Sequence, residues 1–403
     1  MQAGKITDNA ERRRVLPSTG AETGRDRAFL DVAVLTGLRC WLMTGTGRVV
    51  GGAGELPRGT ALRLAAEYQA AARATAGLAG SVGGEAGNGQ FTLLAVAGAR
   101  PSGAPAIAGW FLACAGQRRE WTPGQARAVA GLLAGAAHIR ARAAARSGGE
   151  RGLAEALIGR LAAGGDGTGG CETAALLHAA GLRPGYLAVA FRTDGLPAGR
   201  DLVEDLVGGY TGTTGRSAVA IVGDEVLGVI SGADAPGFAA WLREADPVLK
   251  AAGLTLTAGI GGPADGASAL AGAVRESSGV RRSATLRAIA AGRETAPGVC
   301  VATSAEVDAH ELLLATVPAL VLLSVRERLL GPLAEYDARH NAELLPTLRS
   351  FLACDGSWSV CATRMYVHVN TVRYRIGRIE ALTGRDLSTL PDRVDFFLAL
   401  RGT

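Results

Sequence analysis

The stretch VHVNTVRYRIGRI, residues 367–379, constrains the fold most, because its apolar and polar residues separate by helical spacing. Val372, Ile376 and Ile379 fall on one side of a helical wheel, which predicts that this side packs against a core. The remaining side carries groups that can reach base edges and phosphates. These are Asn370, Thr371, Tyr374, Gly377 and Arg378, flanked by Arg373 and Arg375.

Two shorter helices are predicted ahead of this one. The first carries an apolar stripe and ends at Asp355-Gly356, while the second runs from Trp358 to Met365 with Ser357 as its cap. A tight corner, residues 366–368, then leads into the third helix, which is expected to end at Gly384. The residues expected to face inward are Leu344, Leu345, Leu348, Phe351, Leu352, Val360, Ala362 and Met365.

Two short helices joined by a tight corner, with polar residues at the start of the second, predict a helix-turn-helix. Between Arg364 and Arg385 there are five Arg and one acid, Glu380, so this segment carries a net +4 of the chain's +5. Basic amphipathic helices are often only solvated surface. Charge alone therefore does not identify a DNA-binding face, and the spacing of the motif carries the inference.

Residues 344–387 resemble the C-terminal DNA-binding domain of the PucR/CdaR-like bacterial transcription regulators. Two positions depart from that pattern: Met365 stands where Leu is usual, and Tyr366 occupies a corner position that often holds Gly. The matching residues are Thr347-Leu348, Ala362, Met365, Val367-His368, Asn370-Thr371, Tyr374-Arg375 and Thr383-Gly384.

The resemblance implies, and the helical wheel supports, that one set of side chains lines a DNA groove. His368 is expected to cap the third helix or to contact a phosphate rather than to bind a metal. The candidate DNA-binding residues are His368, Asn370, Thr371, Arg373, Tyr374, Arg375 and Arg378.

The 403 residues are too many for one ordinary core, so two or three domains are expected. Residues 1–27 are polar and predict a mobile tail. Residues 28–146 alternate strand-like and helical runs, and end in a long helix capped by Thr122 with Pro123 at its first position. The order of strand, turn and terminal helix at the end of this region resembles the end of a GAF-type sensor domain. The Gly-rich stretch within residues 147–170 lacks the Lys-Ser/Thr of a phosphate-binding loop and predicts a linker.

A second α/β domain is predicted over residues 171–310, with a tight hairpin at Gly223-Asp224. This hairpin resembles that of GGDEF-type diguanylate cyclases, but Val222 replaces its first Gly. Arg192 occupies the position expected for a metal-binding acid, and a cation there repels the metal. The domain is therefore expected to be a degenerate GGDEF-like module, with an active nucleotide cyclase or a nucleotide-binding signalling protein as the alternative.

A connecting helix over residues 311–340 and a helix-turn-helix domain over residues 341–403 complete the chain. An entirely helical C-terminal segment is expected to begin after Gly331-Pro332. The expected fold class is multidomain α+β, with a GAF-like α/β sensor, a degenerate GGDEF-like α/β domain and an all-α C-terminal domain. No internal repeat is evident.

The composition narrows the functional classes. Hydrophobic residues make up 48% and charged residues 20%, as in globular domains. No run is long and apolar enough to cross a membrane, and the N-terminus has no apolar core after its charges, so a cytoplasmic location is expected. The six cysteines lack CxxC or metal-ligand spacing, and no metal or cofactor is predicted.

These features together predict a non-enzymatic, sequence-specific transcription regulator that binds double-stranded DNA. It is expected to respond to an unidentified small-molecule effector and to act as a homodimer, because one helix-turn-helix offers little contact area.

Overall fold

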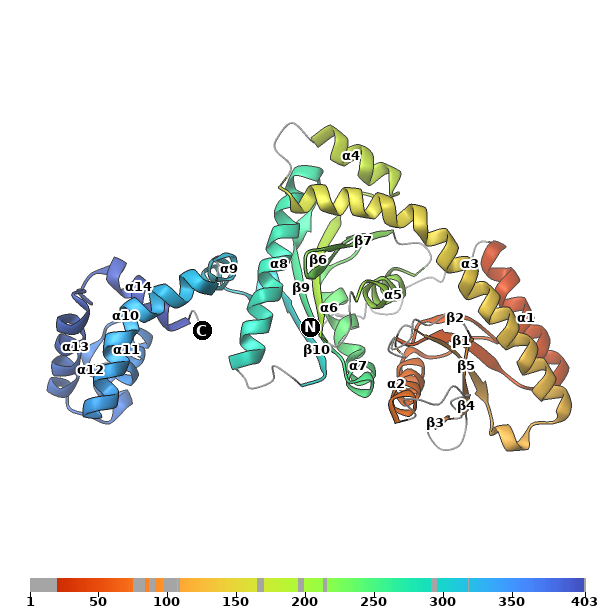
Figure 1. Cartoon of the computed structure of the whole chain (residues 1–403), viewed down its shortest axis with the longest axis horizontal. Coiled ribbons are helices and arrows are strands. Elements are labelled where there is room, and N and C mark those ends of the chain that lie inside the picture. Colours follow the sequence, from red (N-terminus) through yellow and green to blue (C-terminus); the bar gives the residue numbers. More distant parts are fainter. Residues whose placement is uncertain are drawn as a thin grey trace, which may run out of the picture.

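The computed structural model places three bodies in a row (Figure 1). An N-terminal α/β domain lies at one end, a second α/β domain in the middle and a helical domain at the other end. The expected mixture of two α/β regions and a helical C-terminal region is confirmed. The structure describes residues 20–74, 84–86, 91–97, 107, 109–164, 170–194, 199–212, 216–290, 296–317 and 319–401.

The N-terminal domain is built on an antiparallel sheet with strand order β2-β1-β5-β4-β3. Successive side chains of a strand point to opposite faces. Along β1, Trp41 and Met43 therefore pack with α2, whereas Cys40 and Leu42 pack with α1 and α3. The elements are α1 (Gly20–Thr36), β1 (Cys40–Thr44), β2 (Val49–Gly52), α2 (Arg58–Ala74), β3 (Gly84–Ala86), β4 (Phe91–Ala95), β5 (Trp110–Ala115), η2 (Arg118–Glu120) and α3 (Pro123–Ala162).

The predicted tail, residues 1–27, is wrong from Gly20 onward, because α1 begins there. The Asp26 carboxylate accepts a hydrogen bond from the Gly52 N–H at 3.0 Å, and Phe29 is buried against the sheet. These contacts stabilise a helix that the polar sequence did not predict. Residues 1–19 lie outside the described residues.

Helix α3 begins as predicted but ends later. Thr122 and Gln125 form a reciprocal capping box with Pro123 at the first position. The helix then continues through Gly148 and Gly149, where a linker was predicted. Each glycine costs a helix about 1 kcal/mol. Beyond them, Leu157, Ile158 and Leu161 are buried against the second domain, and this packing stabilises the continuous helix. Of the expected linker, residues 165–169 lie outside the described residues.

The second domain has a sheet of order β10-β9-β6-β8-β7, antiparallel except for the parallel pair β9 and β10. Helices α3, α4 and α8 cover one face and α5, α6 and α7 the other. The sequence had not indicated α4 or β10. The elements are α4 (Gly170–Ala179), β6 (Tyr186–Asp194), α5 (Arg200–Thr211), β7 (Ser217–Val222), β8 (Glu225–Ser231), α6 (Ala235–Glu244), α7 (Asp246–Ala252), β9 (Thr255–Ala264), α8 (Ala267–Ala290), β10 (Gly298–Thr303) and η3 (Ser304–Glu306).

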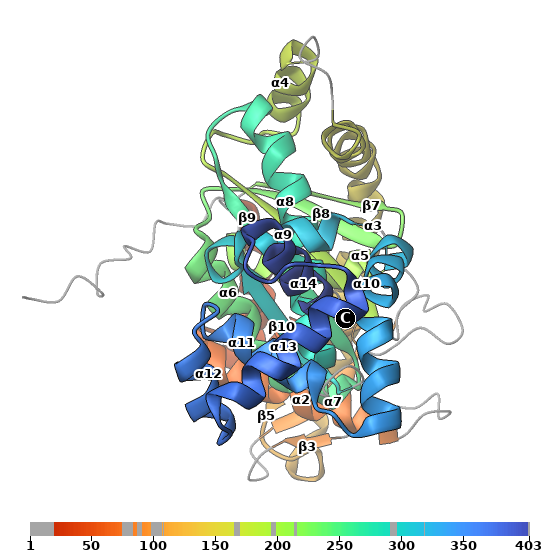
Figure 2. The ribbon, with the colours of Figure 1, turned by 90° about the vertical axis from the view of Figure 1, so that its left-hand side faces the viewer.

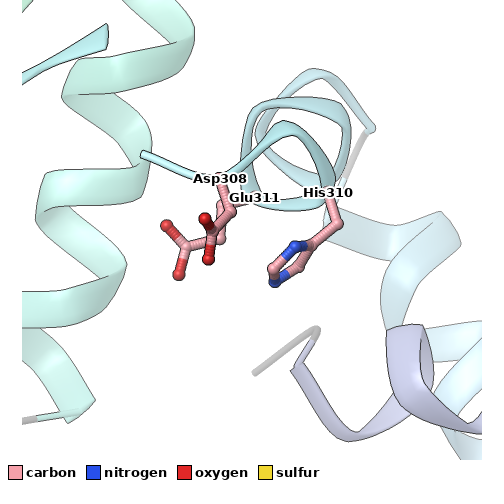
Figure 3. A group of neighbouring side chains, drawn as sticks. All are labelled: Asp308, His310 and Glu311. Atoms are coloured by element: carbon pink, nitrogen blue, oxygen red, sulfur yellow. The ribbon is translucent and has the colours of Figure 1, made fainter. Parts of the chain in front are cut away.

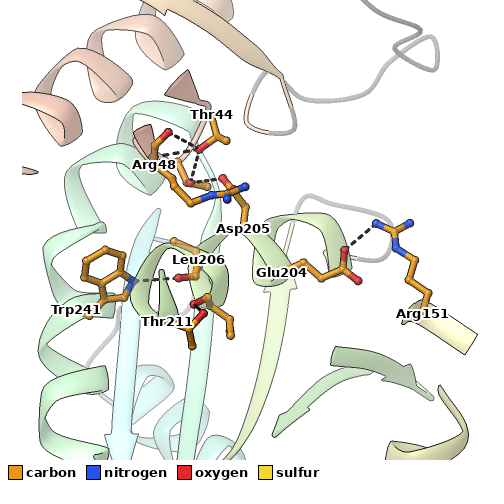
Figure 4. Close-up of polar contacts among 10 residues, drawn as sticks. Thr44, Arg48, Arg151, Glu204, Asp205, Leu206, Thr211 and Trp241 are labelled. Atoms are coloured by element: carbon orange, nitrogen blue, oxygen red, sulfur yellow. Dashed lines mark hydrogen bonds and ion pairs between the residues drawn. The ribbon is translucent and has the colours of Figure 1, made fainter. Parts of the chain in front are cut away.

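The two α/β domains share one continuous hydrophobic core, in which Tyr68 and Phe111 of the first belong to the same cluster as Phe238 and Val248 of the second. Polar contacts reinforce the joint (Figure 4). Arg48 binds Asp205 at 2.6 Å, and Arg151 on α3 binds Glu204 on α5 at 2.7 Å. Helix α3 thus contacts both domains and fixes one against the other.

The helical domain begins inside α10, not after it. Leu329, Leu330 and Leu333 of α10 are buried with the C-terminal helices, so α10 continues through Gly331-Pro332, where a boundary was predicted. Among the described residues, no helix combines the length and apolar character needed to cross a membrane. The remaining elements are α9 (Ala309–Thr316), α10 (Ala319–His340), α11 (Leu344–Ala353), α12 (Trp358–Met365), α13 (Val369–Thr383) and α14 (Leu390–Arg401).

Candidate nucleic-acid interface

Helices α12 and α13 have the predicted bounds and are joined by a tight corner. Tyr366 ends α12 with φ 57°, in the left-handed region, and Gly384 ends α13 in the same way with φ 66°. His368 is the N-cap of α13, and its Nδ1 accepts a hydrogen bond from the Asn370 N–H at 3.2 Å. The predicted capping role of His368 is therefore confirmed, whereas Ser357 occupies the N-cap position of α12 without a side-chain hydrogen bond.

The inward face of α13 is the predicted one. Val372, Ile376 and Ile379 are each at most 1% exposed, and they pack with Leu348, Phe351 and Phe396. In α12, Ala362 is buried and Met365 partly so, but Val360 is 54% exposed, so its predicted inward position is wrong. One side of α13 is thus fixed against a core built from several helices.

The outward face of α13 begins with exposed polar groups. Asn370 and Arg373 are exposed, Tyr374 is 70% exposed, and Thr371 is half-buried. These side chains leave the first two turns of a helix whose opposite face is immobilised. A helix placed in this way presents amide, guanidinium and phenol groups at a fixed spacing, which suits contacts to base edges and phosphates.

Two arginines of the candidate set contact their own domain instead. Arg375, with only 15% of its side chain exposed, binds the Glu343 carboxylate at 2.8 Å and donates to the Thr347 hydroxyl at 3.2 Å. The Arg378 guanidinium lies over the Tyr336 ring, 4.7 Å from its centroid. In this structure both arginines fasten α13 to α10 and α11, although the helical wheel placed them among the groove residues.

The Arg385 side chain is also engaged internally. It binds Asp392 of α14 at 2.8 Å and Asp395 at 3.3 Å. A hydrogen bond from the Asp386 N–H lowers the pKa of Asp392, and the Arg385 guanidinium lowers that pKa further. Of the five arginines counted in the basic segment, Arg364 and Arg373 are left exposed.

Tyr366 is a candidate site residue that the sequence argument treated only as a departure from the usual corner. Its side chain is 96% exposed, and its left-handed backbone is one that a bulky residue rarely adopts. Such outliers persist where surrounding structure enforces them and often mark functional positions. The signal available from the sequence was the aromatic residue standing where Gly is common.

The hairpin of the second domain forms as predicted. Val222 pairs with Glu225 across a two-residue turn, and Gly223 has φ 62°, the positive value for which hairpin turns favour glycine. Next to it lies a cavity of about 290 Å³, lined in part by Arg192, Asp194, Asp224 and Glu225. This is the place where a nucleotide cyclase would need carboxylates for Mg²⁺.

Arginine side chains form ion pairs with those carboxylates. Arg192 binds Asp224 at 2.9 Å and lies 3.5 Å from Asp194. The nearly buried Glu225 is bound by Arg281 at 2.5 Å and accepts a hydrogen bond from Ser278 at 2.6 Å. A metal ion would have to displace guanidinium groups from these acids. The residues present therefore do not fit a Mg²⁺ site.

A cluster that the sequence argument missed lies at the start of α9 (Figure 3). Ligand atoms of Asp308, His310 and Glu311 lie within 4.8 Å of one another. Glu311, however, accepts hydrogen bonds from Ser283 and Arg287, both at 3.1 Å, and the His310 ring packs against Phe397. The cluster is therefore explained by contacts between helices, and we assign no metal to it.

A cavity of about 350 Å³ lies where the N-terminal sheet, α3 and α5 meet. Charged groups of both signs line it, including Arg48, Arg151, Glu204 and Asp205. A small molecule in this cavity would contact both α/β domains at once.

Comparison with known proteins agrees with this geometry. Residues 344–402 match the family described as the PucR C-terminal helix-turn-helix domain, and residues 166–283 match the GGDEF-like domain. The C-terminal domain is thus similar to the C-terminal helix-turn-helix domain of PucR. The chain therefore matches a GGDEF-like domain model followed by a PucR-type helix-turn-helix model.

Three relatives illustrate the likeness. An uncharacterized protein from the pkwA 5′ region of Thermomonospora curvata is 40% identical over 28% of this chain and 58% of its own length. The transcriptional activator PmfR of Paenarthrobacter nicotinovorans is 36% identical over 19% of this chain and 16% of its own length. This chain thus spans about half the length of the first relative and less of the second.

The third is the crystal structure of a regulator of polyketide synthase expression from Bifidobacterium adolescentis. It aligns with a TM-score of 0.30 and 19% identity, covering 62% of this chain and 97% of that one. A TM-score of 0.30 is too low to support an argument from that structure.

Proposed function

We propose that the protein is a sequence-specific transcription regulator that binds double-stranded DNA in the bacterial cytoplasm through α13. One observation carries the proposal: Asn370, Arg373 and Tyr374 are exposed on a helix whose opposite face is locked into a core. Such a helix can enter a major groove without rearranging.

The outward residues have separable roles in this proposal. Asn370 hydrogen-bonds a base edge, Arg373 contacts a base or a phosphate, and Tyr374 and Thr371 contact the neighbouring backbone or base. His368 caps the helix and lies exposed at its start, within reach of a phosphate. Arg375 and Arg378 act indirectly, by holding α13 against Glu343, Thr347 and Tyr336.

The test is a fluorescence-polarisation titration of the full chain on a DNA fragment from its own promoter region. We expect Arg373→Ala and Asn370→Ala each to weaken specific binding by about 1–3 kcal/mol, or roughly 5- to 150-fold. The control is Arg127→Ala, which removes an exposed arginine of α3 at the far end of the molecule. Equal affinity of the wild type and both α13 variants would contradict the proposal.

We infer that the regulator acts as a homodimer on two half-sites. A single helix-turn-helix contacts too little DNA for tight binding, and twofold operators match twofold proteins. The N-terminal α/β domain is proposed to be GAF-like and to sense a small-molecule effector. The cavity between the two α/β domains is the candidate place for that effector, because a ligand there would contact both.

We also propose that the GGDEF-like domain makes no cyclic dinucleotide and serves signal relay. Supporting this, Asp224 is bound by Arg192 and Glu225 by Arg281. The experiment is incubation of the full chain with GTP and Mg²⁺, followed by chromatography of the nucleotides. Accumulation of a cyclic dinucleotide would favour the alternative of an active cyclase.

A further inference from the structure

The first half of α10 carries exposed apolar side chains. Leu320 is 80% exposed, Val321 49% and Leu323 47%. Single exposed leucines are normal on protein surfaces. Three within residues 320–323 of one helix form a patch of the kind that marks an interaction site.

This patch belongs to a helix with two different environments. Leu329, Leu330 and Leu333, in the second half of α10, are buried in the core of the helical domain. The first half bridges the gap between the GGDEF-like domain and the helical domain (Figure 1), and in the turned view α10 lies to one side of α11, α12 and α13 (Figure 2). The patch is therefore rigidly connected to the DNA-binding helices but is not part of their core.

The charges that follow the patch are self-complementary. Glu327 and Arg328 are both exposed, and neither forms an ion pair with another residue that the structure describes. Leu320, Leu323 and Glu327 are separated by three and then four residues, so they share one stripe of the helix. Arg328 flanks this stripe, so when two copies meet about a twofold axis, Glu327 of one can face Arg328 of the other.

We propose that a second copy of this chain covers the patch, so that the two α10 helices pack together and bring two helix-turn-helix units side by side. This rests on the proposed function, because a twofold operator requires two α13 helices at a fixed separation. The exposed charges favour this partner, because Glu327 of each copy can meet Arg328 of the other.

The size of the patch sets the strength of the dimer. Residues 319–328 of α10 span about 15 Å of helix. A contact of this length buries much less than the roughly 800 Å² per partner that is usual in stable complexes. The free protein is therefore expected to dimerise with a dissociation constant in the micromolar range, and operator DNA is expected to strengthen the dimer through linkage.

The test is sedimentation velocity of the full chain between about 1 and 100 µM, concentrations that bracket a micromolar equilibrium. Wild type is expected to shift from monomer to dimer, and the double variant Leu320→Glu with Leu323→Glu is expected to stay monomeric. Both positions are exposed, so circular dichroism should be unchanged. The matched control is Val34→Glu with Leu35→Glu on α1, where the residues are 84% and 82% exposed. This control should still dimerise.

A cross-linking experiment gives a second readout that does not depend on affinity. Ser324 is exposed on the same half of α10, and Ser324→Cys in a Cys171→Ser background should form a disulfide-linked dimer under mild oxidation. Persistence of the dimer in the α10 variant, its loss in the α1 control, or a wild type that is monomeric throughout would overturn the inference.

DNA binding separates this inference from the proposed function. If both are right, the monomeric α10 variant keeps weak binding to a single half-site but loses the tighter binding to the twofold site. If the variant is monomeric and wild type binds no DNA at all, the proposed function fails while the dimer surface stands. If wild type binds the operator and the α10 variant binds it equally well as a dimer, the surface is wrong.

Discussion

The first turns of α13 and the hairpin of the GGDEF-like domain both concentrate polar groups, but these groups differ in whether they are exposed or paired within the protein. On α13, Asn370, Arg373 and Tyr374 are exposed. At the hairpin, Asp224 and Glu225 are each bound by an arginine. A polar side chain is available to a ligand only where the protein does not already use it, so similar motif-level signals lead to different functional conclusions.

The same contrast occurs within α13 itself. Arg373 and Arg375 lie two residues apart and carry the same group, but Arg373 is exposed while Arg375 binds Glu343 and Thr347. The distinction depends on α11 and its N-cap, because Thr347 lies in α11 and Glu343 directly precedes it. Substitutions at matched positions can therefore separate ligand binding from domain stability.

The largest effect is expected at the hairpin. Arg281→Ala would leave Glu225 buried without its main partner, which typically destabilises a protein by about 3–5 kcal/mol. Urea unfolding of the full chain, followed by circular dichroism, measures this change. The double variant Glu225→Met with Arg281→Met should recover most of the loss, because it removes both charges. If Arg281→Ala unfolds like the wild type, the arginine does not hold the hairpin acid.

Replacing Arg373 and replacing Arg375 of α13 should change different properties. Arg373→Ala should weaken DNA binding by about 1–3 kcal/mol and, if the contact is to a phosphate, reduce the slope of log affinity against log salt by about 1. Its unfolding free energy should not change, because the side chain is exposed.

Arg375→Ala should instead lower the free energy of unfolding of the helical domain by about 1–2 kcal/mol, because it leaves the buried Thr347 hydroxyl without this donor. The salt dependence of DNA binding should keep the wild-type slope. Urea unfolding and salt titrations of both variants make the comparison, and a reversed pattern would exchange the roles given to Arg373 and Arg375.

Replacing Tyr366 is expected to have smaller effects, which raise the stability of the domain but lower its affinity for DNA. Tyr366→Gly relieves a left-handed backbone that is unfavourable for non-glycine residues and should stabilise the domain by up to about 1 kcal/mol. The same change should weaken DNA binding, because a fully exposed ring is lost beside the first turn of α13. Thermal unfolding and polarisation titrations test both halves. Unchanged affinity would show that the strained corner has no role in binding.

The smallest effect concerns acid stability at the junction of α8 and α9. Partial burial would raise the pKa of Glu311, but hydrogen bonds from Arg287 and Ser283 and the charge of Arg287 lower it below 4.5 overall. A carboxyl with a lowered pKa in the folded state stabilises the fold at neutral pH, and this contribution is lost as pH falls through the folded pKa. Glu311→Gln should therefore show a flatter decline of melting temperature below about pH 5. A decline as steep as that of the wild type would contradict this assignment.

Local sequence signals predicted the parts of the fold that depend on short spacing. The bounds of α12 and α13, the Gly384 terminus, the Thr122 cap and the Gly223-Asp224 hairpin all follow from residues within one or two turns of each other. The predictions were wrong for residues 20–27 of the tail, for residues 147–162 of the linker and for the start of the helical domain. Asp26, Leu157 and Leu333 stabilise those helices through partners far away in the sequence.

What the sequence determined by itself is the presence of the helix-turn-helix, the buried stripe of α13 and the tight hairpin at Gly223-Asp224, because periodicity and residue type fix these locally. Only the tertiary structure decided which charges face outward. Arg375, Arg378 and Arg385 meet their partners on α11, α10 and α14, and a helical wheel cannot contain neighbouring helices. The physical reason is that burial and pairing are properties of packed elements, whereas a sequence pattern describes each element alone.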